Sequence, residues 1–411
     1  KIQEDKPLQI HSEKNVEKSI PDYCGLNISD FSRYGEVGAY RFWWRENTVA
    51  ATVQGNRGCR AHCTFCSVEH FNGKGVRGRS VDSIIEELSQ YKEKYGVNHI
   101  MWLDDDLLKD HNRAIKMFDE ISKRNLNVTW DATNGLIASS CTDEVVDAMA
   151  KSGCIAVNIG MESGNPGILR EIRKPGTVDI FIKAAEVLRK YHEIHTSVLL
   201  MIGFPGETLR MAQDTIDVAK QMDCDWYRIS PLQPLPNTPI HDAMIEQGLI
   251  QDVKAGEVRF MGGSYGKQAE IEKGQRSSSF KLFESFEKMR PDDQLNPDQI
   301  TDLWFYMNYT LNFHRIFYEK RKIKLQQLKA HLTTLSEVIS PENGSALYFL
   351  GFLQSLESGT IEQSLVHRFE KRLSESEYWR ERLEAFGLTA KDLIDVNFNI
   401  KDAPTLNNIE F

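Results

Sequence analysis

Three of the seven cysteines of this 411-residue chain lie within eight positions, at Cys59, Cys63 and Cys66 in the stretch GNRGCRAHCTFCSVEHF. Disulfide frameworks are typical of small secreted domains that cannot build a core, and a chain of this length has ample core without one. A structural zinc site needs four ligands, and no second pair of cysteines or histidines follows this loop to complete it. The spacing therefore predicts a metal centre held by three thiolates, with one coordination position left open.

The sequence around this loop alternates short β-rich runs with longer helical patterns, which indicates parallel strands joined by crossover helices. The expected strands cover residues 48–55, 98–104, 127–133, 154–161, 195–203 and 225–233. The expected helices cover residues 81–95, 111–124, 142–152, 179–191 and 207–222. Ser80 and Thr142 are expected N-caps, and Gly153 is an expected left-handed helix end. Six such units predict an α/β fold with a partial TIM-like (β/α)6 barrel, because a complete barrel needs eight.

Polar and glycine-bearing loops follow the carboxyl ends of these expected strands, where a barrel of this kind keeps its active site. After the cysteine loop they are DDD (104–106), DATNG (131–135), MESGN (161–165), GFPGE (203–207) and PLQPLPNTP (231–239). Since parallel strands bring these loops to one rim, we expect them to form a single site.

The chain changes character after about residue 250. Residues 254–280 carry many glycines and serines and are expected to form a connecting loop. Further helices are expected at 296–332, 345–356, 360–373 and 375–386, the last with a capping box from Ser374 to Glu377. The aromatic residues between 304 and 318 occupy more than one helical face, which predicts a buried helix. The expected organisation is a lead-in over 1–47, a barrel over 48–250 and an all-helical C-terminal region over 251–411.

Composition narrows the function classes. The net charge of −9 argues against a broad surface for nucleic acid, and no apolar run is long enough to span a membrane. Reduced thiols favour a cytoplasmic location. The sequence begins at Lys1 rather than Met, so the absence of a signal peptide carries less weight than usual.

The arrangement Cys59-x3-Cys63-x2-Cys66 resembles the signature of the radical S-adenosylmethionine (SAM) superfamily. This resemblance implies that the three thiolates hold a 4Fe–4S cluster, for which soft sulfur ligands are suited. It further implies that the amino and carboxylate groups of SAM chelate the open iron, and that an electron cleaves the sulfonium to release a 5'-deoxyadenosyl radical. An electron donor such as flavodoxin or ferredoxin is the implied protein partner.

The same resemblance assigns roles near the cluster. Phe65 precedes the third cysteine, where the family usually has an aromatic residue against the adenine. LDDD (103–106) falls where the family has a motif that receives the SAM amino group, and Asp104 and Asp106 are the expected contacts because they would share a face if the strand continued. The departure from the usual Gly-Gly-Glu form leaves open which aspartate makes the contact, and a purely structural role in the next turn remains the alternative.

Later loops extend the match across roughly residues 48–240. Glu162 and Ser163 correspond to polar residues that contact the ribose or carboxylate of SAM, and Gly203 and Gly206 correspond to a motif whose backbone lies beside the adenine. The pair 173–174, an arginine and a lysine, is a candidate partner for the SAM carboxylate, with a solvated helix end as the alternative.

Within the superfamily, the motifs are most similar to the branch that usually carries an N-terminal cobalamin-binding domain, which is absent from the residues shown. The resemblance implies a cofactor set of a 4Fe–4S cluster and SAM, with cobalamin as a candidate addition, and a reaction at an unreactive carbon of a small-molecule or other organic substrate. Methyl transfer by a cobalamin-dependent methyltransferase and oxidative cyclisation are the expected reaction types. The competing class is a non-catalytic iron–sulfur redox sensor or interaction protein. No catalytic side chain is assigned.

Overall fold

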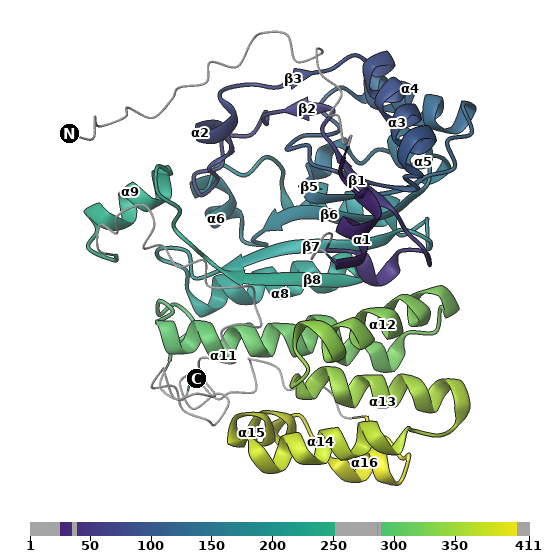
Figure 1. Ribbon diagram of the computed structural model, residues 1–411. Coiled ribbons are helices and arrows are strands. Elements are labelled where there is room, and N and C mark those ends of the chain that lie inside the picture. The colour runs from purple at the N-terminus through teal and green to yellow at the C-terminus, as the bar shows by residue number, and fades with distance from the viewer. Residues whose placement is uncertain (1–24, 35–38, 251–285, 287–288, 401–411) are drawn as a thin grey trace, which may run out of the picture.

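The computed structural model of the chain describes residues 25–34, 39–250, 286 and 289–400. Figure 1 shows an α/β layer, which contains the sheet, above a stack of helices formed by the C-terminal part of the chain. No helix among the described residues is long and apolar enough to cross a membrane. The loop expected at 254–280 lies outside the described residues.

The main sheet has six strands, and each strand pairs in parallel with the next in the order β1-β4-β5-β6-β7-β8. The strands are β1 (Ala50–Val53), β4 (His99–Trp102), β5 (Thr129–Leu136), β6 (Cys154–Glu162), β7 (His195–Ile202) and β8 (Trp226–Pro231). No pairing between β1 and β8 closes this sheet. The six expected strands and the partial barrel are confirmed.

Crossover helices cover the outer face of the sheet. They are α3 (Val81–Tyr95), α4 (His111–Lys123), α5 (Asp143–Lys151), α7 (Val178–Leu188) and α8 (Leu209–Met222). The Oγ atoms of Ser80 and Thr142 accept hydrogen bonds from the third backbone N–H of α3 and α5, which confirms both expected N-caps. A short helix, α6 (Pro166–Glu171), lies between β6 and α7 and was not expected.

Two further strands and one short helix surround the cysteine loop. β2 (Asn56–Arg57) pairs with β3 (Arg77–Gly78) in antiparallel fashion, and α2 (Val68–Asn72) lies between them in sequence. This two-stranded ribbon encloses residues 58–76, so the loop with the three cysteines has a base of backbone hydrogen bonds.

The described part of the lead-in, residues 25–34 and 39–47, packs against the amino ends of the strands, opposite the cysteine rim. It contains α1 (Ile28–Tyr34) and a 3-10 turn, η1 (Arg41–Trp43). The hydroxyl of Tyr40 donates a hydrogen bond of 2.6 Å to Asn158, and the ring of Trp44 lies 4.7 Å from that of His99, the first residue of β4. These contacts fix residues 40–44 to the end of the sheet where the strands begin.

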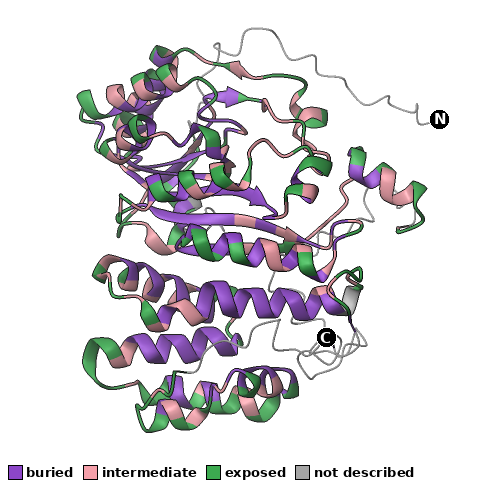
Figure 2. Cartoon of the chain, turned by 180° about the vertical axis from the view of Figure 1, so that it is seen from behind, coloured by how far each residue is buried: buried purple, intermediate pink, exposed green. Residues whose placement is uncertain are grey.

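The part of the C-terminal region that the structure describes is helical, as expected. Its helices, with the preceding α9, are α9 (Pro239–Glu246), α11 (Pro297–Asn308), α12 (Lys322–Thr334), α13 (Gly344–Ser358), α14 (Gln363–Glu375), α15 (Glu377–Ala385) and α16 (Ala390–Ile394). In Figure 2 the helices next to the sheet are buried along most of their length, and the outermost alternate buried and exposed residues. The aromatic cluster beginning at Trp304 is largely buried, which agrees with the expected core role.

Two details of this region were predicted wrongly. The single helix expected over 296–332 is interrupted, because α11 passes into a π-helical turn and a 3-10 turn, and the chain is extended at Glu319 before α12. The N-cap of α15 is Ser376, whose Oγ accepts from the N–H of Trp379, and not Ser374. The reason is that α14 continues through Glu375 and takes Ser374 into its own last turn.

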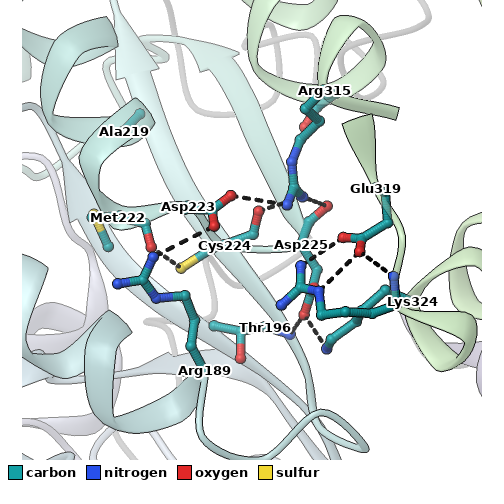
Figure 3. Close-up of polar contacts among 12 residues, drawn as sticks. Arg189, Thr196, Ala219, Met222, Asp223, Cys224, Asp225, Arg315, Glu319 and Lys324 are labelled. Atoms are coloured by element: carbon teal, nitrogen blue, oxygen red, sulfur yellow. Dashed lines mark hydrogen bonds and ion pairs between the residues drawn. The ribbon is translucent and has the colours of Figure 1, made fainter. Parts of the chain in front are cut away.

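A group of charged residues, with the buried pair Lys324–Asp225 at its centre, links these helices to the sheet (Figure 3). The ammonium of Lys324 in α12 lies 2.7 Å from the carboxylate of Asp225, just before β8, and both side chains are at least 90% buried. Asp225 also accepts a hydrogen bond of 2.8 Å from the backbone N–H of Thr196 in β7. The guanidinium of Arg315 donates to the carbonyl oxygen of Asp225 and to the carboxylate of Asp223. The pKa of Asp225 is lowered even though burial alone would raise it, because Lys324 is the strongest of the cations beside it.

Candidate functional site

A cavity of about 1070 Å³ opens at the carboxyl ends of the strands, and the three clustered cysteines line it together. We refer to it below as the cysteine cavity. Its wall also includes residues that follow β4, β5 and β6, so loops far apart in the sequence meet there. The expectation that the loops form one site at this rim is therefore met for the loops after β1, β4, β5 and β6, and also for residues 237 and 239 after β8.

The cysteine loop requires glycine at position 58, where its two ends lie very close together. Gly58 has a φ of +86°, a conformation that strongly favours glycine, and a Cβ at this position would lie 2.1 Å from the carbonyl oxygen of Gly75. Any other residue would push apart the two ends of the loop just before Cys59. The loop can therefore close over the cavity only with glycine at position 58.

The three thiols suit a soft metal centre. Cys59, Cys63 and Cys66 are all partly buried, and none forms a disulfide. Burial raises the pKa of each thiol, that of Cys63 to about 11, while Lys174 counteracts the increase at Cys63 and Cys66. A metal that binds thiolates would take the place of these protons and remove the cost of desolvating an unpaired charge.

A single metal ion fits this arrangement less well than a cluster does. Among the described residues, no three His, Cys, Asp or Glu side chains approach closely enough to hold one ion. In an iron–sulfur cluster each thiolate binds a different iron, so the sulfur atoms are not required to converge on one point. The donor set and its placement therefore fit the implied 4Fe–4S cluster.

The three consecutive aspartates after β4 differ in what they contact and in whether they line the cavity. Both carboxylate oxygens of Asp104 accept hydrogen bonds, from the backbone N–H of Gly55 at 2.8 Å and from that of Asn56 at 2.5 Å. Asp106 forms a two-pronged ion pair with Arg60, with contacts of 2.7 and 2.8 Å. Both acids are nearly fully buried, and neither lines the cavity.

Asp105 is the aspartate that lines the cysteine cavity. Its Oδ2 accepts hydrogen bonds from the N–H of Gly58 at 3.0 Å and from the side chain of Asn72 at 2.7 Å. The expected contacts from Asp104 and Asp106 to the SAM amino group therefore do not fit the geometry, because both carboxylates brace the cysteine loop. The alternation of strand residues failed here because β4 ends at Trp102, before the aspartates.

Glu162 and Lys174 form an ion pair in the cavity wall, with 2.8 Å between Nζ and Oε1. The two side chains are 8% and 12% exposed, so solvent screens the pair only weakly. Glu162 ends β6 with a φ of +69°, which is uncommon for a residue other than glycine and turns the chain at this point. Ser163, by contrast, is fully buried, contacts Thr215 and accepts a hydrogen bond from the N–H of Asn165, so its hydroxyl lies away from the cavity.

Arg173 lines the same wall beside Lys174, and its side chain is exposed. Its φ of +53° turns it out of the end of α6. Among the described residues, its guanidinium has no hydrogen-bond or ion-pair partner. Of the two basic residues singled out in the sequence, Arg173 is therefore the one available to an anionic ligand group.

Phe65 lines the cavity and packs against a small apolar cluster that includes Ile172 and Phe204. The ammonium of Lys174 lies 6.0 Å from the centre of its ring. Phe65 therefore presents an aromatic face beside both the thiols and the Glu162–Lys174 pair. A planar ring could stack on this face.

The glycines of GFPGE are not among the residues that line the cavity. Gly203 has a φ of +85°, and a Cβ there would lie 2.9 Å from the side chain of Ile300 in α11. Its N–H and that of Phe204 donate to the carboxyl group of Glu207, which is buried, and burial raises the pKa of Glu207 to about 7. Gly206 has a φ of +76° and open space around it. Contacts from Gly203 and Gly206 to adenine remain a prediction.

Comparison with known proteins supports the family suggested by the cysteines. Residues 53–219 match the model described as the radical SAM superfamily. The matched segment contains every residue that was expected to bind the cluster or SAM, and it ends before β8.

Among curated proteins, the chain is 34% identical over 198 residues to an uncharacterized methyltransferase of Pyrococcus horikoshii, covering 48% of this chain and 42% of that protein. It is 26% identical over 231 residues to the cytidylyl-2-hydroxyethylphosphonate methyltransferase of Streptomyces wedmorensis, covering 54% and 42%. The chain thus spans well under half the length of these two relatives. More distant matches include tRNA-2-methylthio-N(6)-dimethylallyladenosine synthases, for example that of Aquifex aeolicus at 28% identity over 224 residues, or 52% of this chain and 50% of that protein.

Two solved structures align with parts of this chain. The radical SAM methyltransferase TsrM from Kitasatospora setae aligns with a TM-score of 0.43 and 22% identity, covering 49% of this chain and 40% of that chain. The cobalamin-dependent SAM radical enzyme OxsB aligns with a TM-score of 0.48 and 17% identity, covering 88% and 57%.

Proposed function

We propose that this chain, which carries a radical SAM domain over residues 53–219, is an enzyme that cleaves SAM reductively to act on an unreactive carbon of an organic substrate. The observation that carries the proposal is that Cys59, Cys63 and Cys66 line one cavity together with Phe65 and the Glu162–Lys174 pair. A bound 4Fe–4S cluster supplies the electron for that cleavage. The reaction that we favour is methyl transfer, because two of the three relatives compared above are named methyltransferases.

The residues of the cavity suit the parts of SAM in different ways. Cationic Arg173, which has no partner among the described residues, is the group we assign to the SAM carboxylate. Acidic Asp105 and Glu162 are the candidates for the amino group and the ribose hydroxyls, since carboxylates accept hydrogen bonds from both. Phe65 offers the apolar face for the adenine. Together they replace the expected set in which Asp104 and Asp106 bind the amino group.

Cobalamin is a proposed further cofactor, on the strength of the branch that the motifs resemble. With cobalamin, the chain would transfer a methyl group from SAM and release S-adenosylhomocysteine. The alternative of a redox sensor would need the three thiols but no pocket for an adenosyl group.

The test starts with anaerobic reconstitution of the purified protein with iron and sulfide, followed by dithionite and SAM. We expect 5'-deoxyadenosine, or S-adenosylhomocysteine when cobalamin is added, by liquid chromatography. If neither product forms although the cluster is loaded and reduced, the enzyme proposal is wrong and the sensor remains.

Cys63→Ala tests the ligand set independently of turnover. We expect the variant to lose most of its bound iron and sulfide and the broad visible absorbance of the cluster. Cys141→Ala is the matched control, because Cys141 is buried in the core and does not line the cavity. A Cys63→Ala variant with full cluster content would remove this cysteine from the proposed ligands.

A further inference from the structure

Arg60 follows the first cysteine of the cluster motif, and its guanidinium contacts residues outside the cysteine loop. Its Nε and Nη2 atoms lie 2.7 and 2.8 Å from the two carboxylate oxygens of Asp106. Nη2 also lies 3.3 Å from the carbonyl oxygen of Leu108 and 2.8 Å from Oγ of Ser140. Asp106 and Leu108 follow β4, and Ser140 ends the 3-10 turn η2 (Ala138–Ser140) after β5. One side chain therefore connects the cysteine loop to the loops after the next two strands of the sheet.

The ion pair of Arg60 with Asp106 is shielded from solvent. The side chain of Asp106 is 1% exposed, and that of Arg60 is 28% exposed. Ser140 is fully buried as well. A two-pronged pair of guanidinium and carboxylate fixes both groups in one relative orientation, and burial keeps water from competing for the same contacts. We therefore expect Arg60 to hold its part of the loop in a single conformation.

The same residue lies beside the sulfur atom of the first proposed ligand. The backbone N–H of Arg60 donates a hydrogen bond of 3.3 Å to Oδ2 of Asp106. The next backbone N–H along the chain, that of Ala61, donates to Sγ of Cys59 at 3.4 Å. Asp106 thus holds both the side chain and the backbone of the residue that lies between Cys59 and the N–H donor to its sulfur.

A backbone N–H that donates to a ligand sulfur affects how readily an iron–sulfur cluster is reduced. The reduction potential of such a cluster depends on the net charge around it and on hydrogen bonds to its sulfur atoms. An N–H beside the sulfur stabilises the extra negative charge of the reduced cluster, so it makes the cluster easier to reduce. An unpaired carboxylate at the position of Asp106 would have the opposite effect, and Arg60 prevents this because it neutralises that charge.

We propose that Arg60 is a positioning residue for the cluster. Through its ion pair with Asp106 it keeps the N–H of Ala61 on the sulfur of Cys59, and it thereby raises the potential at which the cluster takes up an electron. The inference rests on the proposed function, since it requires the 4Fe–4S cluster on the three cysteines. Arg60 does not line the cysteine cavity, so it acts on the cluster through Cys59 and not by contact with SAM.

The test replaces Arg60 with methionine, and its matched control is Arg321→Met. Arg321 forms a two-pronged ion pair with Glu319 in the C-terminal part of the chain. The exposed fractions of these two side chains, 30% and 7%, are close to those of Arg60 and Asp106. Both variants therefore lose a similar contact, but only Arg60→Met loses it beside a proposed ligand.

Two measurements on the anaerobically reconstituted proteins need no SAM. The reduction potential of the cluster comes from a titration with dithionite and redox mediators, followed by electron paramagnetic resonance. The stability of ligation comes from the rate at which a chelator removes iron from the oxidised cluster.

In Arg60→Met we expect the ratio of reduced to oxidised cluster at a fixed potential to fall about tenfold, which is a shift of about 59 mV to more negative values for one electron. Iron should also leave the protein severalfold faster. The control variant should stay within about twofold of the wild type, because it changes neither the charge nor a hydrogen bond beside the cluster. Arg60→Lys should lie between the wild type and Arg60→Met, since a lysine keeps the charge but cannot form the two-pronged contact.

A double variant separates position from charge. Arg60→Met alone leaves the carboxylate of Asp106 unpaired, and that charge by itself would lower the potential. Arg60→Met/Asp106→Asn removes both charges and leaves the cysteine loop without its two-pronged contact. We expect this double variant to keep most of the shift in potential and the faster loss of iron.

Three results would overturn the positioning role. They are equal behaviour of Arg60→Met and Arg321→Met, a wild-type potential in the double variant, and, if Arg60→Met does not fold, wild-type values of both measurements in Arg60→Lys. Failure of the loaded wild type to cleave SAM would instead refute the proposed function, and the potentials would still decide the role of Arg60.

Discussion

The ammonium of Lys174 and the carboxylate of Glu162 lie 2.8 Å apart in the wall of the cysteine cavity, where both are largely buried. Lys174 also lies near the thiols, since its charge lowers the pKa of Cys63 and Cys66 against the effect of burial. The positive charge of Lys174 thus stabilises both the carboxylate of Glu162 and the thiolate forms of two proposed cluster ligands.

Lys174→Met should therefore destabilise the protein, because it leaves the Glu162 carboxylate buried without a counter-ion. We expect a loss of about 2–4 kcal/mol in the free energy of unfolding, measured by urea denaturation. Adding Glu162→Gln should recover much of this loss. Lys190→Met, which breaks an exposed pair with Asp143, is the control and should change stability by less than about 1 kcal/mol. Equal effects of the two single variants would contradict the role of burial.

Gly58→Ala should prevent the cysteine loop from closing. The added Cβ would lie 2.1 Å from the carbonyl oxygen of Gly75, and a φ of +86° is unfavourable for alanine. We expect severalfold lower iron content after reconstitution, with the far-ultraviolet circular dichroism of the fold retained. Gly75→Ala has a similar φ of +75° but open space around its Cβ, so it isolates the strain of φ from the clash. Full iron loading of Gly58→Ala would show that the loop can rearrange.

Glu207 predicts a pH dependence of stability. Its pKa is raised to about 7 in the folded protein from 4.5, chiefly by burial. Because the folded state holds the proton more tightly, this residue contributes stability below about pH 4.5 that is lost as the pH rises to about 7. The loss is at most about 3 kcal/mol. Glu207→Gln should gain stability relative to the wild type between pH 5 and pH 8, by urea denaturation at each pH. An identical pH profile for both proteins would refute this.

Lys324→Met should weaken the junction between the sheet and the C-terminal helices. It leaves Asp225 buried and without the cation that contributes most to lowering its pKa. Removal of one partner of a buried ion pair costs about 3–5 kcal/mol, which thermal and urea unfolding would detect. Lys322→Met, at an exposed position two residues earlier in α12, is the control. A stability change as small as that of the control would mean that Asp225 finds another partner.

Sequence patterns predicted the sheet well because each strand is a local apolar run followed by a turn. All six strands and the bounds of α3 follow from that periodicity and from caps such as Ser80. The interruption after α11 could not be predicted, since residues 308–313, NYTLNF, contain no proline or glycine that would mark a break in a helix. There, packing rather than local propensity decides the backbone.

The sequence predicted which loops surround the cavity, but not which side chains of each loop line it. Cys59, Cys63, Cys66, Phe65 and Glu162 line it, as their positions after the strands suggest. The side chains of the three aspartates could not be assigned from the sequence, because their orientation depends on hydrogen bonds with residues 33 to 49 positions away. The partner of Asp106, Arg60, lies inside the cysteine motif itself and was overlooked. A basic residue next to a ligand cysteine, combined with three acids after the next strand, was the available signal.

The buried contacts of Asp225 also bear on where this protein could be cut. The segment that matches the radical SAM model ends at residue 219, yet β7 depends on β8 as its neighbour, and Asp225 depends on α12 for its cation. A fragment ending at 219 would expose one edge of the sheet and the apolar face that α11 covers. We therefore expect the smallest independent folding unit to be larger than the matched segment and to extend at least to the end of α12.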